Sequence, residues 1–329
     1  MLSGILSVKA LRGLRFLIFS LLLVFPGCIS VSLFPPPSPL TETVLSGKGS
    51  AKVLVMDVSG VLSSWSSGWG DKPSLPARIK EELTKAAEDK SVKALVLRIN
   101  TPGGTVTASD ILHHEITAFK EKQKIPVVAS ILDLGTSGGY YVAVAGDKIL
   151  AQPSSITGSM GVIMLTLNAS GLLEKIGIEA QAVTSGPRKD MGSPFRAITP
   201  EERQIFQEVI DSFYGQFLTV IQQGRPQLSK DRIRSLADGR IYTAPQALKH
   251  GLIDGIGYLD DAIELAKQEA GLDSAQVVMY HRPGGYHPNI YSKMSKNTVN
   301  LETLAQFPPD SLTMLLSGGT PKFMYLWLP

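Results

Sequence analysis

From residue 51 onward, short apolar segments alternate with amphipathic ones, and this alternation constrains the fold more than any other feature of the chain. Apolar runs of strand length lie at 53–58, 94–99, 127–132, 148–151 and 180–183. Segments of helical character lie between the first three, at 75–89 and from about residue 107, where Thr107 and Asp110 form a weak capping box. Such an alternation predicts a largely parallel sheet with helices packed on it, which is an α/β fold.

A second helical region follows. Thr199, Pro200 and Glu202 form a strong helix start, with a threonine N-cap, a proline at the first helical position and a glutamate at the third. An apolar face then recurs at helical spacing, made of Phe206, Val209, Ile210, Phe213, Phe217, Val220 and Ile221. We expect this face to pack on the sheet, with packing against another subunit as the alternative. Further helical patterns lie at 229–237, 244–250 and 260–270.

The N-terminus has the layout of a targeting or anchoring segment. Three basic residues precede an apolar run at 16–25, and the one cysteine of the chain, Cys28, follows a glycine. The arrangement resembles a bacterial lipoprotein signal, in which Cys28 would carry a lipid after cleavage. The alternative is an uncleaved anchor, because 16–34 approaches the ~20 residues that span a bilayer. In both cases the body lies outside the inner membrane.

These patterns predict four regions. They are a signal or anchor at 1–34, a proline-rich extended spacer at 35–50, a catalytic domain at 51–281 and a loosely structured tail at 282–329.

Composition excludes several classes of protein. A share of 43% apolar residues excludes a disordered chain, and a net charge of only +3 without a basic stripe argues against nucleic-acid binding. The five histidines have no acidic or thiol neighbours at zinc-ligand spacing, so we expect neither a metal nor a cofactor.

The residues that carry chemistry begin at Ser137. This serine follows the apolar run at 127–132, has glycines on both sides and opens a short helix, whose free amides favour developing negative charge. A nucleophile at such a turn needs two N–H donors for the oxyanion. Gly138 is a natural first donor, and Gly103-Gly104, after the preceding strand, offers a second. A glycine-rich helix cap is the structural alternative for the same pattern.

The base is the harder question. His250 with Asp147 or Asp190, and His281 with Asp254, are formally available for a Ser-His-Asp triad. His250, however, is typical of the last turn of a helix that ends at a glycine.

Lys189, 52 residues after Ser137, lies among small and turn residues. A lysine base must be neutral, which costs roughly 4 kcal/mol of desolvation and local field and therefore demands burial and hydroxyl partners. Ser159 is a candidate partner.

Five motifs follow one another along the chain. They are NTPGG at 100–104, SGGYY at 137–141, TGSMGV at 157–162, KDMGSPF at 189–195, and GRIYTAPQA at 239–247 with GLID at 251–254. In this order they resemble the signal peptide peptidase A family of membrane-associated bacterial serine peptidases. The resemblance covers about residues 52–270 and is closest to the short, single-unit type.

This resemblance implies a ClpP/crotonase-like spiral of βαβ units with a helical C-terminal part. It also implies a serine endopeptidase with Ser137 as nucleophile, Lys189 as general base, Gly104 and Gly138 as oxyanion donors and Ser159 orienting the lysine. Remnant signal peptides would be the substrates, at the bacterial cell membrane. Short members form rings in which the serine and the lysine come from neighbouring subunits, so the dyad need not close within one chain.

Two other interpretations of the function remain open. One is an inactive membrane-tethered scaffold that binds peptides, and the other is an esterase with a Ser-His-Asp triad.

Overall fold

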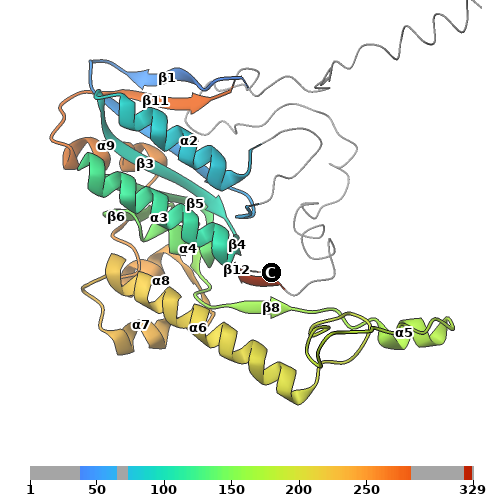
Figure 1. Ribbon diagram of the computed structural model, residues 1–329. Helices are drawn as coiled ribbons and strands as arrows, with labels where there is room; N and C mark the ends of the chain where they lie inside the picture. The colour runs from blue at the N-terminus through green and yellow to red at the C-terminus, as the bar shows by residue number, and fades with distance from the viewer. Residues whose placement is uncertain (1–37, 65–72, 283–321, 328–329) are drawn as a thin grey trace, which may run out of the picture. The chain divides into compact units, whose positions relative to one another are not determined.

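The computed structural model describes residues 38–64, 73–282 and 322–327, and within them nine strands form one sheet (Figure 1). Its path runs β1-β11-β2-β3-β5-β6-β10, and β7 pairs with β5 and β9 beside it. The strands are β1 (Thr41–Gly47), β2 (Lys52–Ser59), β3 (Val92–Thr101), β5 (Val127–Thr136), β6 (Lys148–Ala151), β7 (Ile156–Gly158), β9 (Ile241–Thr243), β10 (Gly255–Ile256) and β11 (Gln276–His281). Only β1 and β9 pair antiparallel, so the predicted α/β class with a mainly parallel sheet is confirmed.

Three further strands make a small antiparallel sheet in the order β4-β12-β8. These are β4 (Gly103–Thr105), β8 (Ile163–Leu165) and β12 (Lys322–Leu326). The middle strand comes from the far end of the sequence and pairs with both neighbours.

The helices occupy both faces of the large sheet. They are α2 (Leu75–Glu88), α3 (Val106–Gln123), α4 (Gly138–Ala143), α5 (Ser170–Lys175), α6 (Pro200–Gly224), α7 (Lys230–Leu236), α8 (Ala244–Lys249) and α9 (Leu259–Glu269). In Figure 1, α2 and α3 lie in front of the strands, while α9 covers the opposite face.

The two cores follow from the alternation of side chains along each strand. On β2, Leu54 and Met56 join the core with α2 and α3, whereas Val53 and Val55 join the core with α9. Because a parallel strand is covered on both faces, its sequence is a continuous apolar run, which is why these strands were recognisable in the sequence.

The helix at 199–221 is present as α6, and Thr199 and Glu202 form its capping box. Phe206, Phe217 and Ile221 are buried, so the apolar face packs against the chain's own core.

Three details differ from the sequence-based expectations. No strand forms at 180–183, where the backbone is exposed and has no pairing partner among the described residues. Helix α3 begins at Val106, one residue before the expected start near Thr107, because the Thr105 side chain accepts a hydrogen bond from the Ala108 amide.

The third difference is that strands lie on both sides of the 51–281 range. β1 falls within the expected spacer and pairs with β11, and β12 falls within the expected loose tail. The expected segment at 1–34 lies outside the described residues. None of the helices in the described part is long and apolar enough to span a bilayer.

Candidate active site

Ser137 lies at the point where β5 ends and α4 begins, and its backbone is held in an unusual conformation. Its φ of 53° and ψ of −114° fall outside the regions that residues with a Cβ commonly adopt. The Ser137 amide donates to the Gly158 carbonyl over 2.7 Å. The residue is 1% exposed, and its hydroxyl makes no cap hydrogen bond to α4. Strain of this kind at a strand-to-helix turn makes Ser137 a candidate functional position.

Gly103, Gly104 and Gly138 meet beside this serine. A Cβ on Gly103 would lie 2.7 Å from the Gly138 nitrogen, and a Cβ on Gly104 would lie 1.9 Å from the Leu62 carbonyl oxygen. Gly103 also has a φ of 98°. Larger residues would therefore collide with backbone at this point, so the glycines are required for the close approach of β4 to the start of α4.

Strand β12 runs along the other edge of β4 and presents the Tyr325 carbonyl to these glycines. Tyr325 pairs with Gly104, and the Trp327 amide donates to the Pro102 carbonyl over 2.9 Å. Because antiparallel pairs of one kind recur every second residue, the Trp327 bond indicates that Gly104 and Tyr325 are also a hydrogen-bonded pair. A Cβ on Gly138 would lie 3.1 Å from the same Tyr325 oxygen. The carbonyl of Tyr325, which pairs with Gly104, thus lies against Gly103 and Gly138, at the start of the turn that carries Ser137.

The Tyr325 side chain fills an aromatic recess behind this carbonyl. Its ring stacks on Tyr141 with centroids 5.1 Å apart and lies 4.6 Å from the ring of Phe217. Its hydroxyl donates to the Phe213 carbonyl over 2.8 Å. Burial raises the pKa of both Tyr141 and Tyr325, so both rings stay neutral. The recess therefore accepts a large, uncharged side chain.

Ser159 is brought beside Ser137 by strand pairing. Thr136 pairs with Gly158 across the parallel strands β5 and β7, so the next residue of each strand, Ser137 and Ser159, follows at the same sheet edge. Ser159 also has a positive φ of 50°, and its amide donates to the Arg240 carbonyl over 2.7 Å.

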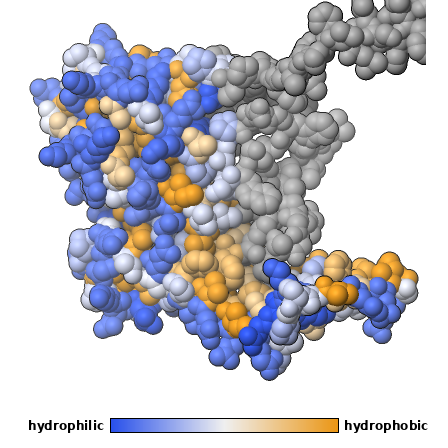
Figure 2. Space-filling model, in the orientation of Figure 1, coloured by the Kyte–Doolittle hydropathy of each residue, from blue (hydrophilic) through white to orange (hydrophobic). Residues whose placement is uncertain are grey.

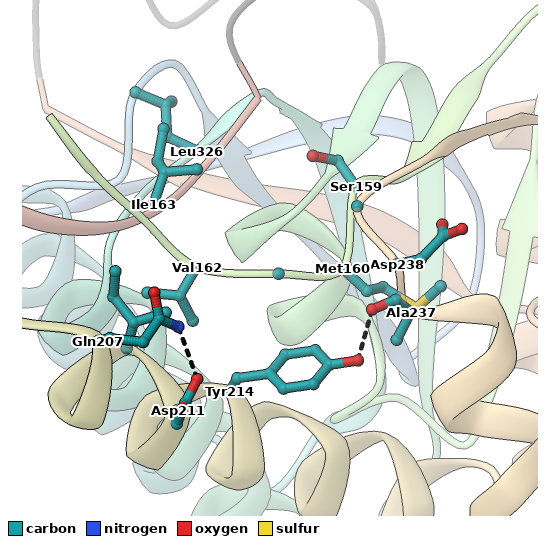
Figure 3. A pocket seen from close by; sticks show the side chains of 13 residues that line it. Ser159, Met160, Val162, Ile163, Gln207, Asp211, Tyr214, Ala237, Asp238 and Leu326 are labelled. Carbon is teal, nitrogen blue, oxygen red and sulfur yellow. Dashed lines mark hydrogen bonds between the residues drawn. The ribbon is translucent and has the colours of Figure 1, made fainter. Parts of the chain in front are cut away.

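A pocket of about 410 Å³ begins at Ser159 (Figure 3). Ile163 and Leu326 lie on one side of it, Ser159 and Asp238 on the other, and Tyr214 closes the bottom. The Tyr214 hydroxyl donates to the Ala237 carbonyl over 2.6 Å. Leu326 is the residue directly after Tyr325, so this pocket adjoins the groove between β4 and β8 that β12 occupies.

Lys189 lies elsewhere in the same chain. Residues 166–196 leave the end of β8, carry α5 and return to the start of α6 as an arm that extends away from the sheet (Figure 1). Lys189 is exposed on this arm, and no hydrogen bond joins it to Ser137 or Ser159 within the described chain. The structure therefore brings together Ser137, Gly104, Gly138 and Ser159, but not Lys189.

The two histidines considered for a triad are also remote from Ser137. His250 ends α8, where it contacts Arg232 over 2.8 Å and packs against Tyr242. His281 ends β11, three strands away from β5 in the sheet, and contacts Thr43. No group of three or more candidate metal ligands occurs in the described part of the chain. Cys28 lies outside it.

Sequence reasoning missed the participation of β12 and the aromatic recess. The apolar run at 323–327 was the available signal, but its partner strands lie about 160 and 220 residues earlier, which no local pattern indicates.

The sequence of the chain is similar to a known peptidase family and to several known proteins. Residues 119–273 match the family described as Peptidase family S49. An Enterococcus faecium protein to which the name signal peptide peptidase SppA has been assigned is 37% identical over 241 residues, 73% of this chain and 70% of that protein. The Arabidopsis thaliana protein named serine protease SPPA, chloroplastic, is 32% identical over 238 residues, 71% of this chain and 35% of that protein. A solved structure of a mutant of the 1510-N membrane-bound stomatin-specific protease is 15% identical, with a TM-score of 0.43, over 67% of this chain and 86% of that one.

Proposed function

Since the chain belongs to peptidase family S49 and is a serine-type endopeptidase, we propose that Ser137 is its nucleophile and that Lys189 of a neighbouring subunit is its general base.

The position of the Tyr325 carbonyl is the single observation that carries this proposal. It lies against Gly103 and Gly138, and Tyr325 pairs with Gly104, so a substrate carbonyl at this point would be close to the two amides proposed for the oxyanion hole. Strand β12 thus lies where we propose that an extended substrate binds. Tyr325 takes the position of the substrate residue whose carbonyl carbon is attacked. A substrate bound in this way adds a strand between β4 and β8 and gains main-chain hydrogen bonds on both sides.

The chemistry follows from these positions. The neutral amine of Lys189 takes the proton of the Ser137 hydroxyl as its oxygen attacks the substrate carbonyl carbon. The oxyanion that forms is stabilised by the Gly104 and Gly138 amides. The lysine ammonium then gives the proton to the leaving amine, and water hydrolyses the acyl-enzyme in a second, equivalent cycle. Ser159, which follows the strand partner of Thr136 at the same sheet edge as Ser137, would hold the lysine amine by a hydrogen bond.

The arm explains why a second subunit is needed. Seven of the thirteen large apolar side chains exposed in the described residues lie between 165 and 195. Figure 2 shows apolar surface along the arm and where it joins the body. A monomer would leave this surface in water, whereas a second copy of the chain would cover it and bring a lysine out of water at the same time. Repeated head-to-tail contacts of this kind close into a ring.

The substrates we propose are apolar peptides, with remnant signal peptides as the biological case. The rings of the aromatic recess are uncharged, and Asp110 at its edge accepts a hydrogen bond from the Tyr141 hydroxyl. Burial lowers the pKa of His113, which packs against Tyr141, to about 4, so His113 is also neutral near pH 7. The membrane location rests on the sequence of residues 1–34, with Cys28 as the candidate lipid attachment site or with an uncleaved anchor.

The test uses the purified full-length protein and an apolar peptide with a tyrosine at the expected cleavage position. We expect Ser137→Ala and Lys189→Ala each to lower kcat by about 10⁴-fold or more, since the two groups act as a unit. A serine-reactive fluorophosphonate should label the wild type at Ser137. Lys249→Ala, on the exposed side of α8, is the matched control and should keep full turnover.

Substantial turnover by Lys189→Ala would contradict the dyad and revive a histidine base. Absence of labelling and of turnover in the assembled wild type would instead support a peptide-binding scaffold.

A further inference from the structure

Arg196 makes the densest set of ion pairs on the arm. Its Nε and one terminal nitrogen each lie 2.7 Å from an oxygen of Asp190, which is the residue directly after Lys189. The other terminal nitrogen lies 2.9 Å from Glu202, and the guanidinium makes a second short contact to the same carboxylate. One guanidinium thus holds two carboxylates at once, a geometry that lysine cannot reproduce.

The Glu202 end of this arrangement is fixed to the body. Glu202 is 3% exposed and completes the capping box of α6, accepting from the Thr199 amide over 3.0 Å. Four residues along, Phe206 is buried. Arg196 therefore ties the turn that carries Lys189 to a helix start that the core holds in place.

The Lys189 turn has few other attachments. The Lys189 amide donates to the Gly186 carbonyl over 3.1 Å, and the Ser193 amide donates to the Asp190 carbonyl over 3.0 Å. Both bonds lie within the turn itself. The Pro194 carbonyl accepts a hydrogen bond from the Ala169 amide. This bond connects the outgoing and returning segments of the arm, but it does not connect the turn to the body.

The charges around this turn are unevenly balanced. The hollow between the turn and α6 is lined by five charged side chains, Arg188, Asp190, Arg196, Glu201 and Glu202. Hydrogen bonds from Arg196 hold the pKa of Asp190 and of Glu202 below their usual range, so both carboxylates are ionised. Without Arg196, three carboxylates would face one remaining arginine.

We propose that Arg196 is a positioning residue for the catalytic base, which fixes the Lys189 turn on α6 and neutralises the carboxylate of Asp190 beside the lysine. This role rests on the proposed function, because it concerns the same lysine. The physical reason is that an opposite charge close to an amine favours its protonated form, whereas a base must be neutral. An unpaired Asp190 would therefore require a higher pH for the same fraction of active base.

The experiment compares pH profiles of kcat/KM for four variants of the full-length enzyme. Arg196→Gln should move the acid limb of the profile to higher pH by about half a unit or more and should lower kcat by about tenfold. Asp190→Asn should move the acid limb to lower pH or leave it in place. The double variant Asp190→Asn/Arg196→Gln should return the limb to the wild-type position while kcat stays low. Arg196→Lys should keep the acid limb at the wild-type position but should not keep the full kcat. Lysine retains the positive charge, but it cannot bind the Asp190 and Glu202 carboxylates at the same time in the geometry of the guanidinium.

Arg282→Gln is the control, since Arg282 pairs with Glu81 at the far end of the sheet and should leave the profile unchanged. Oligomeric state and Tm are measured for every variant. If Arg196→Gln fails to assemble, the other single variants still test the proposal. An Arg196→Lys variant with the full wild-type kcat, or an acid limb that moves to higher pH in Asp190→Asn, overturns it.

The inference is overturned if Arg196→Gln keeps the wild-type limb and kcat, or if the double variant shifts as far as Arg196→Gln. These failures are distinguishable from failure of the dyad. Activity in Lys189→Ala overturns the proposed function, whereas an inactive Lys189→Ala with an unchanged Arg196→Gln overturns only the role of Arg196.

Discussion

The Ser137 turn and the Lys189 arm are built in opposite ways. Ser137 is buried at the carboxyl end of a central strand. The nearby Gly103 and Gly104 lie so close to other backbone atoms that a Cβ at either position would collide with them. Lys189 is exposed on a projection held by surface ion pairs and flanked by exposed apolar side chains. Core packing therefore positions Ser137, the proposed nucleophile, within one chain, whereas Lys189, the proposed base, would be buried only by assembly.

The largest effect that would sharpen this contrast concerns the glycines. Gly138→Ala places a methyl group 2.4 Å from the Ser109 hydroxyl and 3.1 Å from the Tyr325 oxygen, so the amide of residue 138 must move. We expect kcat to fall by about 10²-fold or more, as for loss of one oxyanion donor. Gly215→Ala, in α6 with open space around it, is the matched control and should keep kcat. Equal kcat values for Gly138→Ala and the wild type would remove Gly138 from the oxyanion hole.

A smaller effect should follow from removal of β12. If β12 occupies the substrate groove, a chain that ends at residue 321 should bind peptides with a KM lower by about tenfold, because a tethered competitor has been removed. A synthetic peptide of residues 322–329 should then inhibit the truncated enzyme competitively, and a scrambled peptide of the same composition should not. A folded, assembled truncation with unchanged KM would mean that substrates bind elsewhere.

The smallest expected effect is a difference in pH response between the body and the arm. Burial raises the pKa of Glu82, in α2, to about 7 from an ordinary value of 4.5. The folded state thus binds the proton more tightly, and stability falls as the pH rises from about 4.5 to 7. Glu82→Gln should therefore raise the unfolding free energy at pH 8 by about 3 kcal/mol, with little change below pH 4.5.

On the arm, the pKa of Asp190 is lowered by its hydrogen bonds to Arg196, so the sign reverses. The stabilisation is present above the ordinary carboxyl range near 4 and is lost as the pH falls below it. Hydrogen exchange of the arm should accelerate in acid while the body becomes more stable. The same sign in both regions would contradict the contrast.

What the sequence could predict follows the range of the interactions. The position of Ser137 and Gly138 at a strand-to-helix turn could be predicted because such turns have local signatures, and the parallel strands because they are apolar throughout. The strand expected at 180–183 is absent because AQAV is compatible with a strand but has no neighbour to pair with. The pairing of Tyr325 with Gly104 was invisible because it joins positions 221 residues apart. The location of Lys189 on a projecting arm was not predicted, because no local pattern in the sequence indicates that residues 166–196 leave the sheet.

The claim that one chain supplies the nucleophile and another the base can be measured directly by mixing two inactive variants. Ser137→Ala and Lys189→Ala are purified, combined in equal amounts, dissociated and reassembled, then assayed with the apolar peptide. If the dyad spans two subunits, random mixing places a functional serine beside a functional lysine in about a quarter of the sites, and the mixture should regain about that share of wild-type kcat. A reassembled mixture as inactive as either variant alone, while wild type treated in the same way recovers, would contradict the account.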